Sequence, residues 1–337
     1  MSVKFAIVGI GHIAKKHIQA IKDIENAELV ALCDNDPNRL EEYSREYKVF
    51  TDLEEMLKTC PEINVVNICV PSGLHAKLTV LCAKYGKHVI VEKPIALKLE
   101  DAKQMIDVCQ QNNVKLAVIH PNRFRPAIME LKQKVDSDSF GKLSHANATV
   151  RWNRNQAYYE QAPWRGTKEF DGGVLMNQAI HNLDLLIWMM GPIESVQAMA
   201  ATRVRKIEAE DVAGAVVKFK NGALGIIEAT TAIYPENLEE SLSIFGENGS
   251  AKISGKNANF IETWNFKDVS EESSNELKEK VKQDPFGKPG HHCIIEDMVN
   301  AIHEDRTPVV TGQDGLAPVK LILAILESAE KGTQISL

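Results

Sequence analysis

The first 120 residues alternate short, β-branched apolar runs with longer segments in which apolar residues recur every three or four positions. The runs are typical of buried strands and the longer segments of amphipathic helices, so the alternation predicts a parallel sheet wound by crossover helices. The expected strands are Phe5–Val8, Leu29–Cys33, Val65–Val70, Val89–Val91 and Leu116–Ile119. The expected helices are His12–Ile24, Asn38–Tyr47, Leu53–Lys58, Ala76–Tyr85 and Leu99–Asn112. Residues 1–121 are therefore predicted to form a doubly wound α/β domain.

After Pro121 the strands lengthen and hairpin signals appear between them. A helix near Arg125–Val135 precedes the first strand, and Asn221-Gly222 and Asn248-Gly249 are typical hairpin turns. The expected strands are Leu143–Trp152, Val196–Val204, Val212–Phe219, Ala223–Thr231, Ser241–Gly246 and Ala251–Ser254. Further helices are expected at Val174–Met190, His291–His303 and Leu316–Lys331. Residues 122–337 are therefore predicted to form an α+β domain with a mainly antiparallel sheet.

One segment between these elements, Asp268–Gly290, is polar and rich in Glu and Lys, and it ends in several Pro and Gly residues. It can bury little surface of its own. Two interpretations remain open from the sequence, a mobile loop over a site and a surface excursion with a short exposed helix.

Composition and charge exclude several classes of protein. With 337 residues, 44% apolar and 25% charged, the chain is expected to be a soluble globular protein. A net charge of -7 gives no overall attraction to nucleic acid or to an anionic membrane. A strand-like start without a signal core, and no run of about 18 apolar residues, predict a cytoplasmic location. The six cysteines show no C-x-x-C spacing and are interpreted as reduced core residues, so no metal site is expected.

A glycine loop, Gly9-Ile10-Gly11-His12-Ile13-Ala14, follows the first strand and opens the first helix. In this context Gly9 allows a tight turn and Gly11 lets the backbone approach a pyrophosphate, while the small Ala14 lets helix and strand pack closely. His12 and Ile13 lie where the helix N-terminus would face the anion. The loop therefore predicts a dinucleotide site.

The second strand ends in Asp34, which lies 25 residues after Gly9. That is close to the usual spacing of the acid that accepts hydrogen bonds from the ribose hydroxyls. Asp34 and Asp36 together would repel a 2′-phosphate, so NAD is favoured over NADP. Asp34 could instead cap the helix after Pro37, although Asp36 fits that cap better.

Two later loops end predicted strands. Val70-Pro71-Ser72-Gly73-Leu74-His75 closes the strand from Val65, and cofactor contacts are expected from Pro71, Ser72 and His75, because open α/β sheets bind ligands at strand carboxyl ends. His75 could equally be a helix residue without a role.

Glu92-Lys93-Pro94 follows the strand Val89–Val91 directly. This position is expected to direct the Lys93 amine into the cleft, where it could move a proton. The alternative is a surface lysine paired with Glu92.

Asn177, His181 and Asp184 are spaced i, i+4 and i+7 on a predicted helix that is otherwise largely apolar. All three are expected on one face, where the amide and the carboxylate could set the tautomer of the imidazole, and Asn177 and Asp184 are candidates for substrate binding. A lone core histidine with satisfied hydrogen bonds is the alternative.

Five of the ten arginines fall within 43 residues, among aromatic side chains. The arginines are Arg123, Arg125, Arg151, Arg154 and Arg165, and the aromatic residues are Trp152, Tyr158, Tyr159 and Trp164. Guanidinium groups suit a diphosphate or a carboxylate, and aromatic rings can stack on a base or a sugar, so Arg123, Arg154 and Tyr159 are candidates for substrate binding. Arginines on the solvent side of a strand are the ordinary alternative.

Taken together, the glycine loop, Glu92-Lys93-Pro94, Asp171-Gly172-Gly173 and His181-Asn182-Leu183-Asp184 resemble the glucose-fructose oxidoreductase, inositol dehydrogenase and MocA family. The resemblance covers essentially the whole chain. It implies a Rossmann domain, an open-faced sheet domain, a nicotinamide cofactor, and a polyol or sugar substrate.

Residue by residue, the resemblance implies that Lys93 lies near the reacting hydroxyl and that His181 is a base or a substrate ligand. It implies that Trp164 and Arg165 contact the cofactor, as do Glu92, Lys93 and Pro94. Asn177 departs from the aspartate of the inositol dehydrogenases, and an amide cannot accept a proton as a carboxylate can. Asn177 and Gln156-Ala157-Tyr158-Tyr159 are similar to members that oxidise C3 of UDP-N-acetylglucosamine or of its uronic acid.

The sequence therefore favours an NAD-dependent sugar dehydrogenase that forms a 3-keto sugar and assembles as a homodimer or homotetramer, with no nucleic-acid or membrane partner. An inositol or free-sugar dehydrogenase of the same family remains open. A noncatalytic NAD-binding regulator would be expected to lack Lys93 and His181. A methyltransferase would have no use for Glu92-Lys93-Pro94.

Overall fold

A computed structural model describes residues 2–337, which divide into two compact units. Residues up to Pro121 form the first unit together with Pro289–Leu316, and Asn122–Lys288 form the second together with Ala317–Leu337. The predicted boundary at residue 121 leaves Pro289–Leu316 in the second domain. In the structure this segment packs with the first unit instead, since helix α9 (Gly290–His303) contacts helix α1 (Ala14–Asp23).

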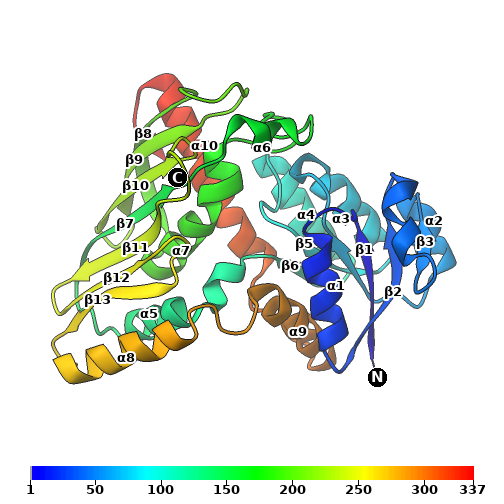
Figure 1. Cartoon of the computed structure of the whole chain (residues 1–337), viewed down its shortest axis with the longest axis horizontal. Coiled ribbons are helices and arrows are strands. Elements are labelled where there is room, and N and C mark those ends of the chain that lie inside the picture. Colours follow the sequence, from blue (N-terminus) through cyan, green and yellow to red (C-terminus); the bar gives the residue numbers. More distant parts are fainter. Residues whose placement is uncertain (1) are drawn as a thin grey trace. The chain divides into compact units, whose positions relative to one another are not determined.

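The first unit is a six-stranded parallel sheet with the strand order β3-β2-β1-β4-β5-β6 (Figure 1). This is the doubly wound order of dinucleotide-binding folds, as predicted. The strands are β1 (Val3–Val8), β2 (Ala27–Cys33), β3 (Lys48–Phe50), β4 (Val65–Ile68), β5 (His88–Val91) and β6 (Leu116–Val118). The other helices of the unit are α2 (Leu53–Thr59), α3 (His75–Lys84) and α4 (Leu99–Gln111).

One helix predicted in this unit is wrong. Asn38–Tyr47 contains two short 3₁₀ turns, Pro37–Arg39 and Glu41–Tyr43, in place of a helix. Leu40 is the one buried residue between positions 38 and 47, so this stretch has no apolar face that could hold a longer helix against the sheet. Strand β3, which follows it, was not predicted.

The second unit contains an eight-stranded mixed sheet with the order β13-β12-β11-β7-β10-β9-β8-β14. Strands β7 and β10 are parallel neighbours, and the other neighbouring pairs are antiparallel. Both predicted hairpins, at Asn221-Gly222 and Asn248-Gly249, are confirmed. The strands are β7 (Leu143–Arg151), β8 (Ile193–Ala201), β9 (Val212–Phe219), β10 (Leu224–Thr230), β11 (Glu239–Gly246), β12 (Gly249–Ser254), β13 (Phe260–Phe266) and β14 (Ile335–Ser336).

Helices pack against this sheet in the second unit (Figure 1). Helix α7 contacts β7 and β11, α5 contacts β12, and α8 contacts β13. The helices are α5 (Pro126–Asp136), α6 (Gln156–Glu160), a π-helical turn (Leu175–Ala179), α7 (Ile180–Met190), α8 (Glu271–Gln283) and α10 (Gly312–Lys331), of which α10 begins in the first unit. Helix α8 occupies most of Asp268–Gly290, so the interpretation of this segment as an exposed helix is the correct one.

The sheet has an exposed face on strands β8, β9 and β10. Residues of β9 alternate strictly between exposed and buried from Ala213 to Phe219. Val216 and Ile226 are cross-strand neighbours on the exposed side, 52% and 50% exposed, and Met199 on β8 is 83% exposed. This open face matches the expectation drawn from the family resemblance. In residues 2–337 no helix combines the length and apolar character needed to cross a membrane.

Candidate functional site

The glycine loop joins β1 to α1 in the predicted geometry. Gly9 has a φ of +89°, and a Cβ there would lie 2.7 Å from the carbonyl oxygen of Cys69, so no other residue fits without displacement. A Cβ at Gly11 would meet nothing within 4 Å, which means that the backbone of Gly11 faces open space. This open space, close to the N-terminal turn of α1, is where the sequence predicts the pyrophosphate.

Asp34 lies at the end of β2, beside this loop. Its carboxylate is 5% exposed and accepts hydrogen bonds from the backbone N–H groups of Ile10 (2.6 Å) and Asp36 (2.9 Å). Asp36 in turn caps the turn Pro37–Arg39 by accepting a bond from Asn38, so the cap belongs to Asp36, as the sequence favoured. Asp34 thus ties the strand end to the glycine loop, where a ribose would follow the pyrophosphate.

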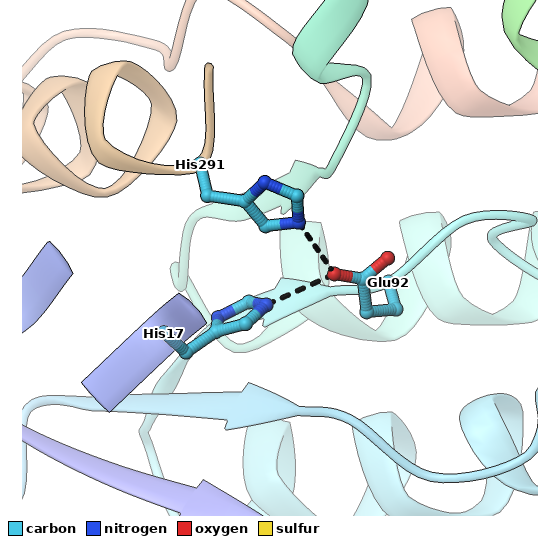
Figure 2. Close-up of side chains that lie close together, drawn as sticks. All are labelled: His17, Glu92 and His291. Carbon is cyan, nitrogen blue, oxygen red and sulfur yellow. Dashed lines mark hydrogen bonds and ion pairs between the residues drawn. The ribbon is translucent and has the colours of Figure 1, made fainter. Parts of the chain in front are cut away.

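The Glu92 carboxylate is buried between two histidines of the first unit (Figure 2). Its Oε1 atom lies 2.9 Å from Nε2 of His17 on α1 and 3.1 Å from Nε2 of His291 on α9. Burial alone would raise the pKa of Glu92, but the hydrogen bonds from His17 and His291 hold this pKa well below its usual value. The carboxylate is therefore ionised, and Lys93 follows it half-buried.

These same three residues form the one cluster within residues 2–337 whose donor atoms could hold a metal ion. The hydrogen bonding argues against that use. Asn67 Nδ2 donates to Nδ1 of His17 at 3.0 Å, so the proton of this imidazole lies on Nε2, directed at Glu92. A metal ligand would need Nε2 unprotonated.

Asn177 and His181 come from a helix that widens at its start. Asn177 lies in the π-helical turn Leu175–Ala179, and His181 lies in the first turn of α7. Such π-turns are frequent at functional sites. Asn177 donates a hydrogen bond to Asp171, whose other carboxylate oxygen accepts from Gly166 N–H at 2.7 Å, so Asp171 joins the loop after Arg165 to the helix that bears His181.

Glu210 caps the same helix. Its buried carboxylate accepts a bond from Leu175 N–H at 3.0 Å, and burial raises its pKa. A Cβ on Gly173 would lie 2.3 Å from this carboxylate, which explains why the sequence has glycine there.

The arginine cluster divides into two groups. Three arginines pair with carboxylates, namely Arg123 with Asp184, Arg125 with Glu240, and Arg151 with Glu228 and Glu239. Arg154 and Arg165 have no carboxylate partner in the described part of the chain and lie against aromatic rings instead. Their Cζ atoms lie over the ring of Tyr158, 5.3 Å and 4.3 Å from its centre. We call Trp152, Arg154, Tyr158, Trp164 and Arg165 the arginine–aromatic stack.

Two protein-family models match this chain, one in each unit. Residues 3–120 match the model of an oxidoreductase family with an NAD-binding Rossmann fold, and residues 128–252 match the GFO/IDH/MocA C-terminal domain. The WlbA dehydrogenase of Bordetella pertussis, solved with NADH and UDP-GlcNAcA, is 36% identical with a TM-score of 0.94, over 100% of this chain and 98% of that one. The chain belongs to the GFO/IDH/MocA family.

Two further relatives support the assignment to the GFO/IDH/MocA family. The WlbA dehydrogenase of Chromobacterium violaceum, solved with the same two ligands, is 36% identical over 100% of this chain and 96% of that one, with a TM-score of 0.94. The myo-inositol 2-dehydrogenase of Thermotoga maritima is 26% identical over 99% of this chain and 98% of its own length. As a member of this family, the chain is an oxidoreductase, and its cofactor is NAD.

The placement of three predicted site residues in this GFO/IDH/MocA member differs from expectation. Arg123 is buried and donates from Nε and Nη2 to the buried Asp184, at 2.8 and 2.6 Å, so these two side chains bind each other. Tyr159 is also buried, with its hydroxyl 3.2 Å from Thr231, whereas the half-exposed Tyr158 takes the place in the stack.

His75 is the other predicted contact that the structure engages elsewhere. Its ring is fully buried, with Nδ1 2.8 Å from the carbonyl oxygen of Pro94 and Nε2 3.0 Å from that of Val70. Burial lowers the pKa of this imidazole. The ring thus holds the loop after β4 to the Glu92-Lys93-Pro94 loop. Pro71 and Ser72, the other cofactor contacts expected from this loop, are half-exposed.

Sequence reasoning missed His17, His291 and Glu210. A signal for the two histidines existed, because each begins or joins an apolar stripe at helical spacing. His17 lies on the buried side of α1 together with Ala14, Ile18 and Ile21. His291 lies on the buried side of α9 together with Ile294, Ile295 and Met298. A polar residue within such a stripe is buried and needs a partner. For Glu210 no comparable pattern exists.

Glu240 is a buried carboxyl group of the second unit whose pKa is raised, and this shift can be tested. Burial raises its pKa from 4.5 to about 7, despite Asn122 at 3.1 Å and Arg125 at 3.3 Å. Because the folded state then keeps a proton that the unfolded state has released, the stability that this group contributes is complete below pH 4.5 and is lost as the pH rises to about 7.

We therefore expect the free energy of unfolding to fall between about pH 5 and about pH 8 by more in the native protein than in the Glu240→Gln variant. Urea titrations at both pH values measure it. Equal losses in the two proteins would show that Glu240 titrates normally.

Proposed function

We propose that this NAD-dependent sugar oxidoreductase oxidises the C3 hydroxyl of a UDP-N-acetylhexosamine, or of the corresponding uronic acid, to a 3-keto sugar. The observation that carries the proposal is the arginine–aromatic stack, with two guanidinium groups that no carboxylate neutralises. Two WlbA dehydrogenases solved with UDP-GlcNAcA are similar to the chain over its whole length, which supports the same substrate class.

The stack has the chemistry that a nucleotide sugar requires. A diphosphate carries charge that Arg154 can meet with planar N–H donors, and Trp152 offers a face for a uracil or sugar ring. Trp164 and Arg165, expected from the resemblance to contact the cofactor, lie beside them in the stack. The Arg154 guanidinium is already oriented, since its Nη1 donates to the carbonyl oxygen of Asn153 at 2.6 Å and to Asn237 at 3.2 Å. A preoriented guanidinium loses little side-chain entropy on binding.

Lys93 and His181 are the candidates for the base that removes the proton of the C3 hydroxyl. Either can accept one proton while C3 gives up a hydride, so that the alcohol becomes a ketone. Bound NAD supplies the hydride acceptor. Asn177 is assigned to binding and orienting the substrate and not to proton transfer, because its amide cannot take a proton. Its Nδ2 donates to Asp171.

A second candidate is oxidation of an inositol or a free sugar. It is favoured by the similarity to the myo-inositol 2-dehydrogenase of Thermotoga maritima over 99% of the chain. Such a substrate has no diphosphate, so Arg154 would have no anion of the substrate to bind, while Arg165 could still meet the cofactor.

A substrate panel tests the proposal. Purified protein with NAD is offered UDP-N-acetylglucosamine, its uronic acid, free hexoses and myo-inositol, and NADH is followed by absorbance. We expect turnover with a UDP-sugar. Turnover with inositol alone would overturn the proposal.

Two arginine variants sharpen the test. Arg154→Ala should raise KM for the UDP-sugar by about tenfold or more, as expected for the loss of a charged hydrogen bond. Arg151→Ala is the matched control, because Arg151 lies three residues earlier and is neutralised by Glu228 and Glu239. Equal KM values in both variants would remove the stack from substrate binding.

We also propose that the exposed face of β8, β9 and β10 is covered by a second copy of the chain. The apolar side chains of Met199, Val216 and Ile226 are exposed together on this face, and contact with a second copy would remove them from water. Val216→Glu with Ile226→Glu should convert dimers or tetramers to monomers in light scattering after gel filtration. Asn275→Glu on α8 is the control, and an unchanged mass in the double variant would contradict the proposal.

A further inference from the structure

The buried triad His17–Glu92–His291 joins three segments that are far apart in the sequence (Figure 2). Both imidazoles reach the same oxygen, Glu92 Oε1, at 2.9 and 3.1 Å. The side chain of His17 is 0% exposed, that of Glu92 8% and that of His291 11%, so little water competes for the carboxylate. The two rings meet edge to face, with centroids 5.3 Å apart.

The protons of this triad can be assigned from the surrounding bonds. Asn67 Nδ2 is a donor, so Nδ1 of His17 accepts and Nε2 carries the hydrogen. Burial lowers the pKa of His17, which keeps the ring neutral. His17 Nε2–H and His291 Nε2–H therefore both donate to Glu92, whose carboxylate is ionised.

The second oxygen of Glu92 extends the network to the lysine. Glu92 Oε2 accepts the backbone N–H of Lys93 at 3.3 Å. The carboxylate is thus fixed on one oxygen by two histidines and holds the main chain of Lys93 with the other. Helix α1, which carries His17, begins directly after the glycine loop, so the triad connects this helix to the backbone of Lys93.

We propose that His17 and His291 are positioning residues that orient Lys93 through the Glu92 carboxylate. The proposal rests on the proposed role of Lys93 as a proton acceptor near the substrate. Neither histidine contacts the reacting atoms. Each acts through Glu92 on the backbone from which the amine projects, and a displacement of about 1 Å at a reacting group is enough to cost up to about 100-fold in rate.

The proposal predicts a change in pH dependence. Without the imidazole donors, the hydrogen bonds that lower the pKa of Glu92 are lost while burial still raises it, so this pKa rises and the carboxyl becomes protonated at a higher pH. The titratable and charged groups that face the triad are Lys16 on α1, Cys69 after β4, His75 on α3 and Lys93 itself. The thiol of Cys69 does not interfere, because burial raises its pKa well above the ordinary value.

The variants are His17→Leu, His291→Leu and, as matched controls, His17→Gln and His291→Gln, because a glutamine amide can place an N–H donor near the position of Nε2. The first readout needs no substrate. In protein labelled with ¹⁵N-lysine, the Lys93 amide resonance, assigned by its loss in Lys93→Arg, is followed from about pH 5 to about pH 9. It should titrate in the leucine variants and stay fixed in the native and glutamine proteins.

The second readout is the pH profile of kcat with a UDP-sugar and NAD. The leucine variants should lose about 10- to 100-fold in kcat, with KM for NAD little changed and the acid limb moved to higher pH. The glutamine variants should retain the native profile. A merely structural role would lower the melting temperature without moving this limb. If His17→Leu does not fold, His291→Leu at the partly exposed ring carries the test.

The outcomes separate the two proposals. Activity retained in Lys93→Ala would remove the proposed function, while the resonance experiment would still decide the contact between Glu92 and Lys93. Inactive Lys93→Ala together with an unmoved acid limb and an unshifted resonance in the leucine variants would overturn this inference alone.

Discussion

Replacing Lys93 with alanine is expected to lower kcat for oxidation of a UDP-sugar by about 10²- to 10⁴-fold, the usual contribution of a positioned base. The methyl group of alanine cannot accept the hydroxyl proton. Removal of the lysine side chain leaves strand β5 and the bonds of Glu92 to His17 and His291 in place. NAD binding, measured by protein fluorescence, should change little, because the pyrophosphate and ribose are expected to contact the glycine loop and Asp34. Steady-state kinetics with UDP-N-acetylglucosamine or its uronic acid measures the effect.

The control for this variant is Lys98→Ala, an exposed lysine five residues further along the same loop. It should retain native kcat. His181→Ala, measured in parallel, decides which of the two residues is the base, since the base variant loses the pH dependence of kcat that belongs to its proton transfer. A Lys93→Ala enzyme within about twofold of the native kcat would contradict a catalytic role for the amine.

Replacing Asp184 with alanine is expected to destabilise the protein by about 3–5 kcal/mol, because it removes the carboxylate that accepts two hydrogen bonds from the buried Arg123 guanidinium. The side chains of Arg123 and Asp184 are 6% and 1% exposed, and two hydrogen bonds join them. Trp188, whose ring centre lies 5.0 Å from Arg123 Cζ, cannot replace the carboxylate. The free energy of unfolding in urea measures the loss.

Two controls frame that result. The double variant Arg123→Met, Asp184→Leu removes both charges and should recover most of the stability, since an apolar pair of similar volume is often no worse than a buried ion pair. Glu228→Ala, which removes one partner of the surface residue Arg151, should cost about 1 kcal/mol or less. Asp184→Ala and Glu228→Ala with equal costs would show that the Arg123 site is hydrated.

Features set by local patterns could be predicted from the sequence. The apolar runs of β1, β2, β4 and β5 fixed the parallel sheet, and Asn221-Gly222 specified its hairpin because few residue pairs tolerate that turn. The segment 38–47 misled because its helix-forming residues lack an apolar face, and propensity without burial does not sustain a helix. Strands β3 and β14 are short edge strands with too few residues for a pattern.

The sequence indicates which residues are candidates for the site, but it does not indicate which side chains they contact. Glycine spacing predicts the loop that joins β1 to α1, and helical spacing singles out the polar residues Asn177, His181 and Asp184. Their partners could not be predicted, because the sequence does not say which distant side chains meet. Arg123 and Asp184 are 61 residues apart, and His291 and Glu92 are 199 apart. A guanidinium that binds a ligand and one that binds an internal carboxylate therefore look alike in the sequence.

The return of Pro289–Leu316 to the first unit limits how this enzyme can be re-engineered. A chimaera that exchanges the nucleotide-binding part with that of a relative has to transplant two pieces of chain, because cutting after Pro121 alone would leave α1 without α9 and Glu92 without His291. Donor and recipient must agree at both junctions. The first unit therefore has to be exchanged as two fragments together, and a single boundary after residue 121 would separate them.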